Sequence, residues 1–265
     1  MAAPWFEDEI AGALAPLLPG VAVEVVAEID STSTELMRRA REGRHRPVLL
    51  VAERQTAGRG RLGRNWQSAQ HERDPASLTF SLGLPLAPRD WSGLSLAVGV
   101  SVAESLDPDG AAGVGLKWPN DLWVEDRKLG GILIETALFQ PQASQRYLVI
   151  GIGINVGPRE GGGLNTSPAW LQEWRPKVTA GEVLRELAPA LVRDIRLFDE
   201  KGFVPFATRF AARDVLRGRE VLLSDGTEGR CEGVGWGGEL LVQTAAGMKT
   251  ITSAEVSVRP RRAQP

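Results

Sequence analysis

The spacing of apolar residues predicts a chain of interleaved helices and strands. Apolar side chains recur at helical spacing from Phe6 to Leu18, which predicts a short amphipathic helix, and Val21, Val23 and Val25 alternate as in a strand that ends at Asp30. Further apolar or alternating runs predict strands over Pro47–Glu53, Ser77–Leu84, Val114–Trp118, Gly131–Leu138 and Arg146–Val156.

Two later helices are marked by capping patterns. Thr32 and Glu35 form the S/T-x-x-E pattern, which predicts a helix that begins around Thr32. Thr179 and Glu182 repeat this pattern before a long amphipathic helix, in which Pro189 is a candidate for a kink. One more helix is predicted from the spacing of Trp91, Leu94, Val98, Val102 and Leu106.

The pattern of apolar and turn-forming residues changes near Gly218. Short strand-like runs (REVLL, RCEGV, ELLVQT and KTI) are separated by Asp225-Gly226, Gly237-Gly238 and Ala246-Gly247, which is typical of consecutive hairpins. We therefore expect an α+β protein. Residues 1–213 would form a mixed β-sheet domain with flanking helices, and residues 214–265 would form a small all-β module.

The composition of the chain argues against several classes of protein and several kinds of site. Its 265 residues contain 31 Lys+Arg and 33 Asp+Glu, a formal net charge of −2, which argues against a chain-wide nucleic-acid footprint. The acidic start MAAPWFEDEI is unlike a secretory signal and no apolar run is long enough to span a membrane, so a cytoplasmic protein is expected. Cys231 is the single cysteine, which excludes an internal disulfide, and His45 and His71 lie in polar sequence that argues against a histidine metal site or triad.

A loop rich in glycine and arginine follows the strand that ends at Glu53. Gly58 to Gly63 matches G-x-G-x-x-G, but no helical stripe follows it, so a dinucleotide-binding turn is not predicted. Its arginines alternate with glycine and can close over a polyphosphate; they are Arg54, Arg59, Arg61 and Arg64. A solvated loop whose arginines only keep it soluble is an equally open interpretation.

The segment Lys117-Trp118-Pro119-Asn120-Asp121 joins two strand-like runs. Lys117 ends a buried strand, where an ammonium group is costly unless it meets an anion. A phosphate or oxyanion contact is therefore one interpretation, and a lysine that extends to solvent is the other. Asp121 either holds Mg²⁺ or pairs with a neighbouring cation, and we expect the ion pair.

Three more segments allow a structural and a ligand-binding interpretation. Ser31-Thr32-Ser33 either caps the following helix or forms a polar cradle. The glycines of Gly130-Gly131 and Gly151-Ile152-Gly153 are expected where a ligand or another backbone approaches closely. Asn155 either reads the edge of a nucleobase through its amide or caps its strand.

Five motifs, taken in order, give the chain a specific resemblance. They are Asp30-Ser31-Thr32-Ser33, Glu53 to Arg61 (ERQTAGRGR), Lys117 to Asp121 (KWPND), Lys128 to Leu133 (KLGGIL) and Gly151 to Asn155 (GIGIN). Together they make nearly the whole chain resemble the biotin protein ligases (biotin–acetyl-CoA-carboxylase ligases). The resemblance implies a class II synthetase-like catalytic domain and a C-terminal SH3-like barrel.

The resemblance also implies a two-step, ATP-dependent ligation. The carboxylate of biotin attacks the α-phosphate of Mg·ATP, which gives biotinyl-5′-adenylate and pyrophosphate. A lysine of the biotin carboxyl carrier protein then takes the biotinyl group and releases AMP. ATP and Mg²⁺ are the expected cofactors, no metal ligand is assigned, neither DNA nor a membrane is an expected partner, and a homodimer stays open.

Roles follow from the resemblance motif by motif. Biotin would be bound by Ser31, Thr32, Ser33, Gln55, Arg59, Gly60, Arg61 and Lys117. ATP and the adenylate would be bound by Arg59, Arg61, Arg64, Trp66, Lys117 and Asn155. The expected catalytic residues are Lys117, Arg59 and Arg61, because fixed cations stabilise the charge that builds around one phosphoryl and one carboxyl group.

Some features depart from the family pattern or leave alternatives. Ser33 stands where the family commonly has Asn, and Ser68–Ala76 is longer and more charged than the family's turn, which leaves the manner of loop closure open. The residues before Asp30 are too few for an N-terminal winged-helix domain, so repressor activity is not expected. A lipoate-type ligase on the same fold and a non-catalytic module that binds nucleotide or nucleic acid are the alternative functions.

Overall fold

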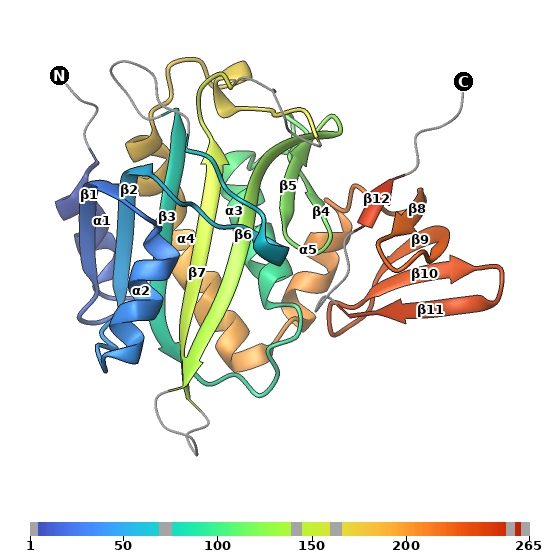
Figure 1. Cartoon of the computed structure of the whole chain (residues 1–265), viewed down its shortest axis with the longest axis horizontal. Coiled ribbons are helices and arrows are strands. Elements are labelled where there is room, and N and C mark those ends of the chain that lie inside the picture. The colour runs from blue at the N-terminus through green and yellow to red at the C-terminus, as the bar shows by residue number, and fades with distance from the viewer. Residues whose placement is uncertain (1–4, 69–75, 139–144, 160–165, 253–257, 261–265) are drawn as a thin grey trace.

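The computed structural model describes residues 5–68, 76–138, 145–159, 166–252 and 258–260. Most of the Ser68–Ala76 segment, including His71, lies outside the described residues. Two β-sheets and five α-helices make up the described part of the chain (Figure 1).

The larger sheet is mixed, as the sequence predicts. Its strand order is β1-β2-β3-β7-β6-β5-β4, and β1 pairs with β2 in parallel while the other neighbours are antiparallel. The strands are β1 (Ala22–Ile29), β2 (Val48–Gln55), β3 (Ser77–Leu86), β4 (Gly115–Lys117), β5 (Asp121–Val124), β6 (Arg127–Leu138) and β7 (Arg146–Asn155). The α+β class and the predicted strands are confirmed.

Strand β5 was not predicted as a separate strand, and it pairs with the first residues of β6. They form a hairpin whose two turn residues, Glu125 and Asp126, have positive φ angles of 49° and 60°. Such turns favour Asn, Asp or Gly at both positions, and Glu125 departs from this preference, so the sequence signal was weak.

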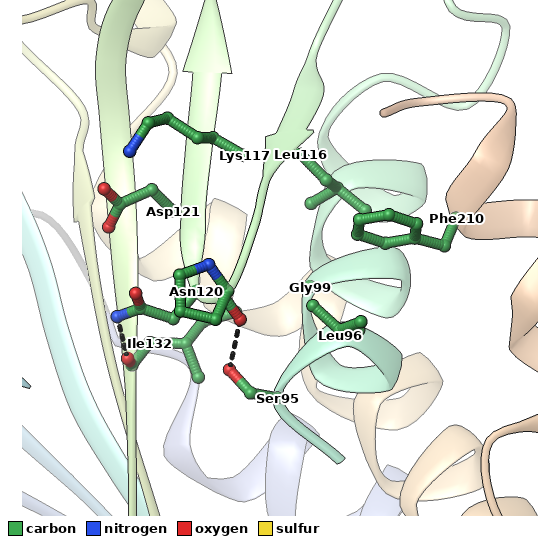
Figure 2. Close-up of a pocket in the computed structure, with 10 residues that line it drawn as sticks. Ser95, Leu96, Gly99, Leu116, Lys117, Asn120, Asp121, Ile132 and Phe210 are labelled. Atoms are coloured by element: carbon green, nitrogen blue, oxygen red, sulfur yellow. Dashed lines mark hydrogen bonds between the residues drawn. The ribbon is translucent and has the colours of Figure 1, made fainter. Parts of the chain in front are cut away.

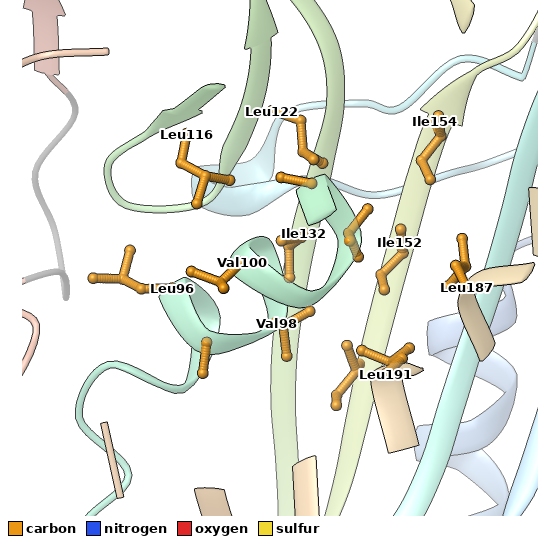
Figure 3. Packing of buried hydrophobic residues seen from close by; sticks show 14 of the residues in the cluster. Leu96, Val98, Val100, Leu116, Leu122, Ile132, Ile152, Ile154, Leu187 and Leu191 are labelled. Atoms are coloured by element: carbon orange, nitrogen blue, oxygen red, sulfur yellow. The ribbon is translucent and has the colours of Figure 1, made fainter. Parts of the chain in front are cut away.

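The helices cover the two faces of the mixed sheet unequally. They are α1 (Glu7–Leu14), α2 (Thr32–Arg41), α3 (Leu94–Leu106), α4 (Ala180–Lys201) and α5 (Ala207–Ala211). Helix α2 and the glycine- and arginine-rich loop lie over one face, and α3 and α4 lie over the other (Figure 1). Val98 of α3 and Leu187 of α4 lie in the same buried cluster as Ile132 and Ile152 of the sheet, so this second face forms the main core (Figure 3). Among the described residues, no helix combines the length and apolarity that crossing a membrane requires.

The capping residue of α2 differs from the prediction. The helix begins at Thr32, but Ser31 is the N-cap, and its Oγ accepts a hydrogen bond from the backbone N–H of Thr34 at 3.3 Å. The Thr32 hydroxyl is instead engaged by Gln55. In α4 the predicted capping box of Thr179 and Glu182 is confirmed. That helix continues through Pro189 without interruption.

The C-terminal hairpins are confirmed and form a five-stranded antiparallel sheet of order β11-β10-β9-β8-β12. The strands are β8 (Glu220–Leu223), β9 (Glu228–Val234), β10 (Leu240–Thr244), β11 (Gly247–Ile251) and β12 (Val258–Pro260). A closed SH3-like barrel and the domain boundary at residue 214 stay predictions. The buried residues of this sheet belong to the same core cluster as those of the mixed sheet.

Two hydrogen bonds join the segment Leu116–Trp118 to the C-terminal part of the chain. The backbone N–H of Leu116 donates to the carbonyl of Arg213 at 2.7 Å, so the connecting chain runs beside β4. The indole N–H of Trp118, which is 1 % exposed, donates to the carbonyl of Gly238 at 3.0 Å. The segment that carries Lys117 is therefore also held by the C-terminal part of the chain.

Candidate active site

The turn between β4 and β5 fixes Lys117 opposite Asp121. The two residues are direct partners in the antiparallel register, and Figure 2 shows the amine of one beside the carboxylate of the other. The turn itself is anchored by Asn120, whose Nδ2 donates to the carbonyl of Ile132 at 2.7 Å. Ser95 of α3 donates to the carbonyl of Pro119 at 3.0 Å. Lys117 thus ends a strand whose backbone has little freedom.

A cavity of about 10 Å³ lies beneath this turn, between the turn and α3. It has room for about one water molecule, so it cannot hold a nucleotide or a vitamin.

The charges around Lys117 are mainly positive. Burial, together with the weaker effect of nearby positive charges on Lys128, Arg64 and Arg259, lowers the pKa of its ammonium group to about 8. Asp121 acts in the opposite direction, but its carboxylate is shared, because Lys128 Nζ lies 2.6 Å from Asp121 Oδ1. This ion pair is the outcome that the sequence favoured for Asp121. A cluster with this excess of cations favours an anionic ligand.

The glycine- and arginine-rich loop reaches the same cluster. Burial lowers the pKa of the Arg61 guanidinium, the carboxylate of Asp121 partly offsets this, and the charge of Arg64 adds to it. Arg64 also acts on Lys117. Arg64 therefore lies near both Arg61 and Lys117, and a shared ligand contact of the three residues stays a prediction. Arg59 instead pairs with Glu135 of β6, and its contact with a substrate stays a prediction.

Internal hydrogen bonds give this loop a defined shape. The backbone N–H of Gly60 donates to the carbonyl of Arg64 at 2.7 Å, and that of Trp66 donates to Gly58 at 2.8 Å. A short 3₁₀ turn (Arg61–Gly63) lies between these bonds. The loop is thus a small hairpin across the sheet face (Figure 1), and the N–H of Gly60, a predicted ligand contact, is engaged within it.

The hydroxyl cluster at the start of α2 is buried and meets Gln55. Ser31, Thr32 and Ser33 are 2 %, 2 % and 5 % exposed. Gln55 Oε1 accepts hydrogen bonds from the backbone N–H of Thr32 at 2.8 Å and from its hydroxyl at 3.1 Å. The structure therefore joins the predicted ligand residues of two separate motifs. It adds Ser81 of β3, whose hydroxyl contacts both Thr32 and Ser33.

Ser81 was missed because it lies inside an apolar strand. Ser77, Thr79 and Ser81 alternate with Leu78 and Phe80, and this period of two places the three polar residues on one face of β3. That face meets α2 and the loop, so the alternation was the signal that could have identified Ser81.

Trp66 and Asn155 both lie near the end of β7. The indole of Trp66 packs on Gly153, where an added Cβ would lie 2.4 Å from the ring. Asn155 Nδ2 donates to the carbonyls of Lys128 and Ala169, at 3.1 and 2.9 Å. These bonds match the strand-end interpretation of Asn155, and a contact with adenine stays a prediction.

Arg159, which the sequence reasoning did not identify, links these two residues. Its guanidinium carbon lies 5.2 Å from the centre of a Trp66 ring, and its Nη1 donates to Asn155 Oδ1 at 2.7 Å. Because Arg159 follows a strand in a segment rich in glycine and proline, no periodicity marked it.

The described residues offer no dedicated site for the expected Mg²⁺. They contain no cluster of three or more His, Cys, Asp or Glu side chains, and the carboxylate of Asp121 is paired with Lys128. We therefore derive no step through a metal ion bound by the protein.

The Biotin/lipoate A/B protein ligase family matches residues 25–155. The Escherichia coli (strain K12) bifunctional ligase/repressor BirA is 35 % identical over 251 residues, which cover 91 % of this chain and 75 % of that protein. The biotin–[acetyl-CoA-carboxylase] ligase of Paracoccus denitrificans is 31 % identical over 240 residues, which cover 88 % of this chain and 98 % of that protein.

Solved structures agree with these relatives. The biotin protein ligase from Aquifex aeolicus in complex with biotin and ATP superposes with a TM-score of 0.75 and 31 % identity, covering 90 % of this chain and 99 % of that one. The chain belongs to the biotin/lipoate protein ligase family and, within it, to the biotin protein ligases.

The electrostatic account of Lys117 makes a direct prediction. Asp121→Asn removes the carboxylate that raises the pKa of Lys117, so this pKa should fall below its value of about 8. The measurement is a pH titration of the ¹³Cε resonance of Lys117. Asp225→Asn, which removes an exposed carboxylate paired with Lys249 in the C-terminal sheet, is the control and should leave the titration unchanged. A Lys117 pKa that rises or stays constant in Asp121→Asn would contradict the account.

Proposed function

We propose that this protein is an ATP-dependent ligase that activates biotin as biotinyl-5′-AMP and transfers the biotinyl group to a lysine of the biotin carboxyl carrier protein. The observation that carries this proposal is the proximity of Lys117, Arg61 and Arg64, since the charge of Arg64 acts on both other residues and Asp121 acts on the same two. The buried hydroxyl cluster of α2 lies under the same loop and supplies polar partners for an uncharged head group.

The first step joins a carboxylate to the α-phosphorus of ATP. An oxygen of the biotin carboxylate forms the new P–O bond, and the bond between the α-phosphorus and the bridging oxygen breaks as pyrophosphate leaves. Two anions must approach each other, so the reaction needs fixed positive charge. We assign this role to Lys117 and Arg61, with Arg64 nearer the departing pyrophosphate.

The second step transfers the acyl group. The neutral amine of the acceptor lysine attacks the carbonyl carbon of the mixed anhydride, AMP leaves with the phosphoryl oxygen, and the amine gives up a proton. Negative charge again builds on the carbonyl and phosphoryl oxygens. Because its pKa is about 8, Lys117 is mostly protonated at neutral pH and can stabilise this charge in both steps.

The other requirements are inferred from the same reaction. Mg²⁺ would arrive with the phosphates of ATP, since nucleotide phosphates commonly supply its ligands. The acceptor would be a carrier domain of acetyl-CoA carboxylase, the enzyme that the Paracoccus denitrificans relative is named for. We place the reaction in the cytoplasm.

The alternatives are less favoured. A lipoate-type ligase shares the family, but the dithiolane ring of lipoate has no hydrogen-bonding groups to match the buried hydroxyls and Gln55. A site built from such groups rejects a ligand that leaves them unpaired. A nucleic-acid-binding module would expose stacking aromatics on a basic groove, whereas the aromatic residue of the loop, Trp66, is packed against Gly153.

The function is tested by incubating the protein with biotin, Mg·ATP and a biotin carboxyl carrier domain. We expect one acceptor lysine to gain a biotinyl group, with AMP and pyrophosphate released in equal amounts. Mass spectrometry of the carrier measures the added biotinyl group. A parallel reaction with lipoate should be much slower. An unmodified carrier in the biotin reaction, or faster modification with lipoate, would refute the proposal.

The role of Lys117 is tested by Lys117→Ala. Loss of one preorganised charge should slow adenylation by about 10²–10³ while the protein stays folded. Pyrophosphate release measures the rate, and circular dichroism measures folding. Lys201→Ala, at the exposed end of α4, is the control and should keep the wild-type rate. A wild-type rate in Lys117→Ala would remove this residue from the mechanism.

A further inference from the structure

Ser81 lies beneath the hydroxyl cluster and touches two of its members. Its side chain is fully buried at 0 % exposure, in the middle of β3. Its Oγ lies 2.7 Å from Thr32 Oγ1 and 2.9 Å from Ser33 Oγ. These contacts extend the pair of Thr32 and Gln55 into a chain of four side chains from three elements: α2, β2 and β3.

The chemistry of the groups fixes the direction of every hydrogen bond in this chain. The backbone N–H of Thr32 can only donate, so the Gln55 atom 2.8 Å away is the amide oxygen, which can only accept. The Thr32 hydroxyl must therefore donate to Gln55 as well. Thr32 Oγ1 can then only accept from Ser81, and Ser81 in turn can only accept from Ser33. The protons run from Ser33 through Ser81 and Thr32 to Gln55.

Gly151 of β7 makes room for this arrangement. It is the register partner of Ser81, and an added Cβ there would lie 2.3 Å from Ser33 Oγ and 3.5 Å from Ser81 Oγ. The missing side chain thus allows α2 to approach the sheet closely enough for Ser33 to reach Ser81. Gly151 belongs to the GIGIN motif, so this glycine has a role within the hydroxyl chain.

We propose that Ser81 is a positioning residue that sets the specificity of the site for a cyclic urea. With its proton committed to Thr32, the Ser81 hydroxyl keeps the proton of Thr32 on Gln55 and leaves one lone pair of Thr32 Oγ1 for a ligand N–H group. A urea ring presents such N–H groups and a dithiolane ring does not. This inference rests on the proposed function, because it assumes that biotin is the acid that is activated.

Removal of the Ser81 hydroxyl should weaken the binding of biotin and leave the binding of ATP unchanged. In Ser81→Ala the Thr32 hydroxyl loses its donor and is free to reorient, so the acceptor presented to the ligand is no longer fixed. Loss of one well-placed hydrogen bond predicts a rise of about tenfold in the KM for biotin. The KM for ATP should stay within about twofold of wild type, and the preference for biotin over lipoate should fall.

The experiment measures pyrophosphate release at varied biotin and varied ATP for wild type, Ser81→Ala and Ser81→Cys. The cysteine variant keeps the volume of the side chain but is a weak hydrogen-bond donor, so it gives the answer if the alanine variant fails to fold. Ser101→Ala on α3 is the matched control. Ser101 is 2 % exposed and its hydroxyl has no hydrogen-bond partner among the residues that the structure describes, so its removal should change neither KM.

The outcomes separate the two levels of the proposal. A selective rise in the KM for biotin supports the role of Ser81. An unchanged KM for biotin in both Ser81 variants, or an equal rise for biotin and ATP, overturns it while wild-type activity leaves the proposed function standing. A wild-type protein that releases no pyrophosphate with biotin overturns the proposed function, and this inference with it.

Discussion

The candidate active site depends on holding several positive charges close to Lys117 at a position that is partly shielded from water. Of the described charged groups that shift the pKa of Lys117, Asp121 alone raises it, and this carboxylate is shared with Lys128. Such an arrangement is unfavourable until an anion arrives. The protein maintains it by fixing the two residues that follow Lys117: the indole of Trp118 donates to the carbonyl of Gly238, and the hydroxyl of Ser95 donates to the carbonyl of Pro119.

The two faces of the mixed sheet have different roles. The face under α3 and α4 is apolar and supplies the main hydrophobic core. The opposite face carries α2, the loop hairpin and the hydroxyl chain. Close approach between these parts is possible because Gly151 and Gly153 have no side chains, which lets Ser33 and Trp66 rest directly on β7. The glycines that the sequence assigned to a close approach thus accommodate the protein's own side chains.

Much of the fold was predictable because periodicity and capping are local signals. The capping box of Thr179, the strand of Pro47–Glu53 and the C-terminal hairpins needed only neighbouring residues. The turn at Glu125-Asp126 was missed because Glu125 is not a usual residue for a positive φ angle. The N-cap of α2 was assigned to Thr32, but the Thr32 hydroxyl donates a hydrogen bond to Gln55 instead. Because Gln55 lies far from Thr32 in the sequence, the local pattern did not indicate this partner.

The sequence motifs identified many of the candidate site residues, but they did not predict how these residues contact one another. The sequence identified Lys117, Arg61 and Gln55 through resemblance, and the structure brings their elements to one face. Ser81 and Arg159 act through contacts between segments far apart in the chain, and neither stands in a motif. The same applies to the pairing of Arg59 with Glu135, because an ion pair between a loop and β6 depends on how the loop folds.

The most direct test of the account is a crystal structure with a non-hydrolysable analogue of biotinyl-5′-AMP. The account predicts that Lys117 Nζ and the Arg61 guanidinium both lie within hydrogen-bond distance, about 3 Å, of oxygens at the carboxyl–phosphoryl junction. An analogue bound with that junction remote from Lys117, or with Arg61 turned away from it, would contradict the central claim.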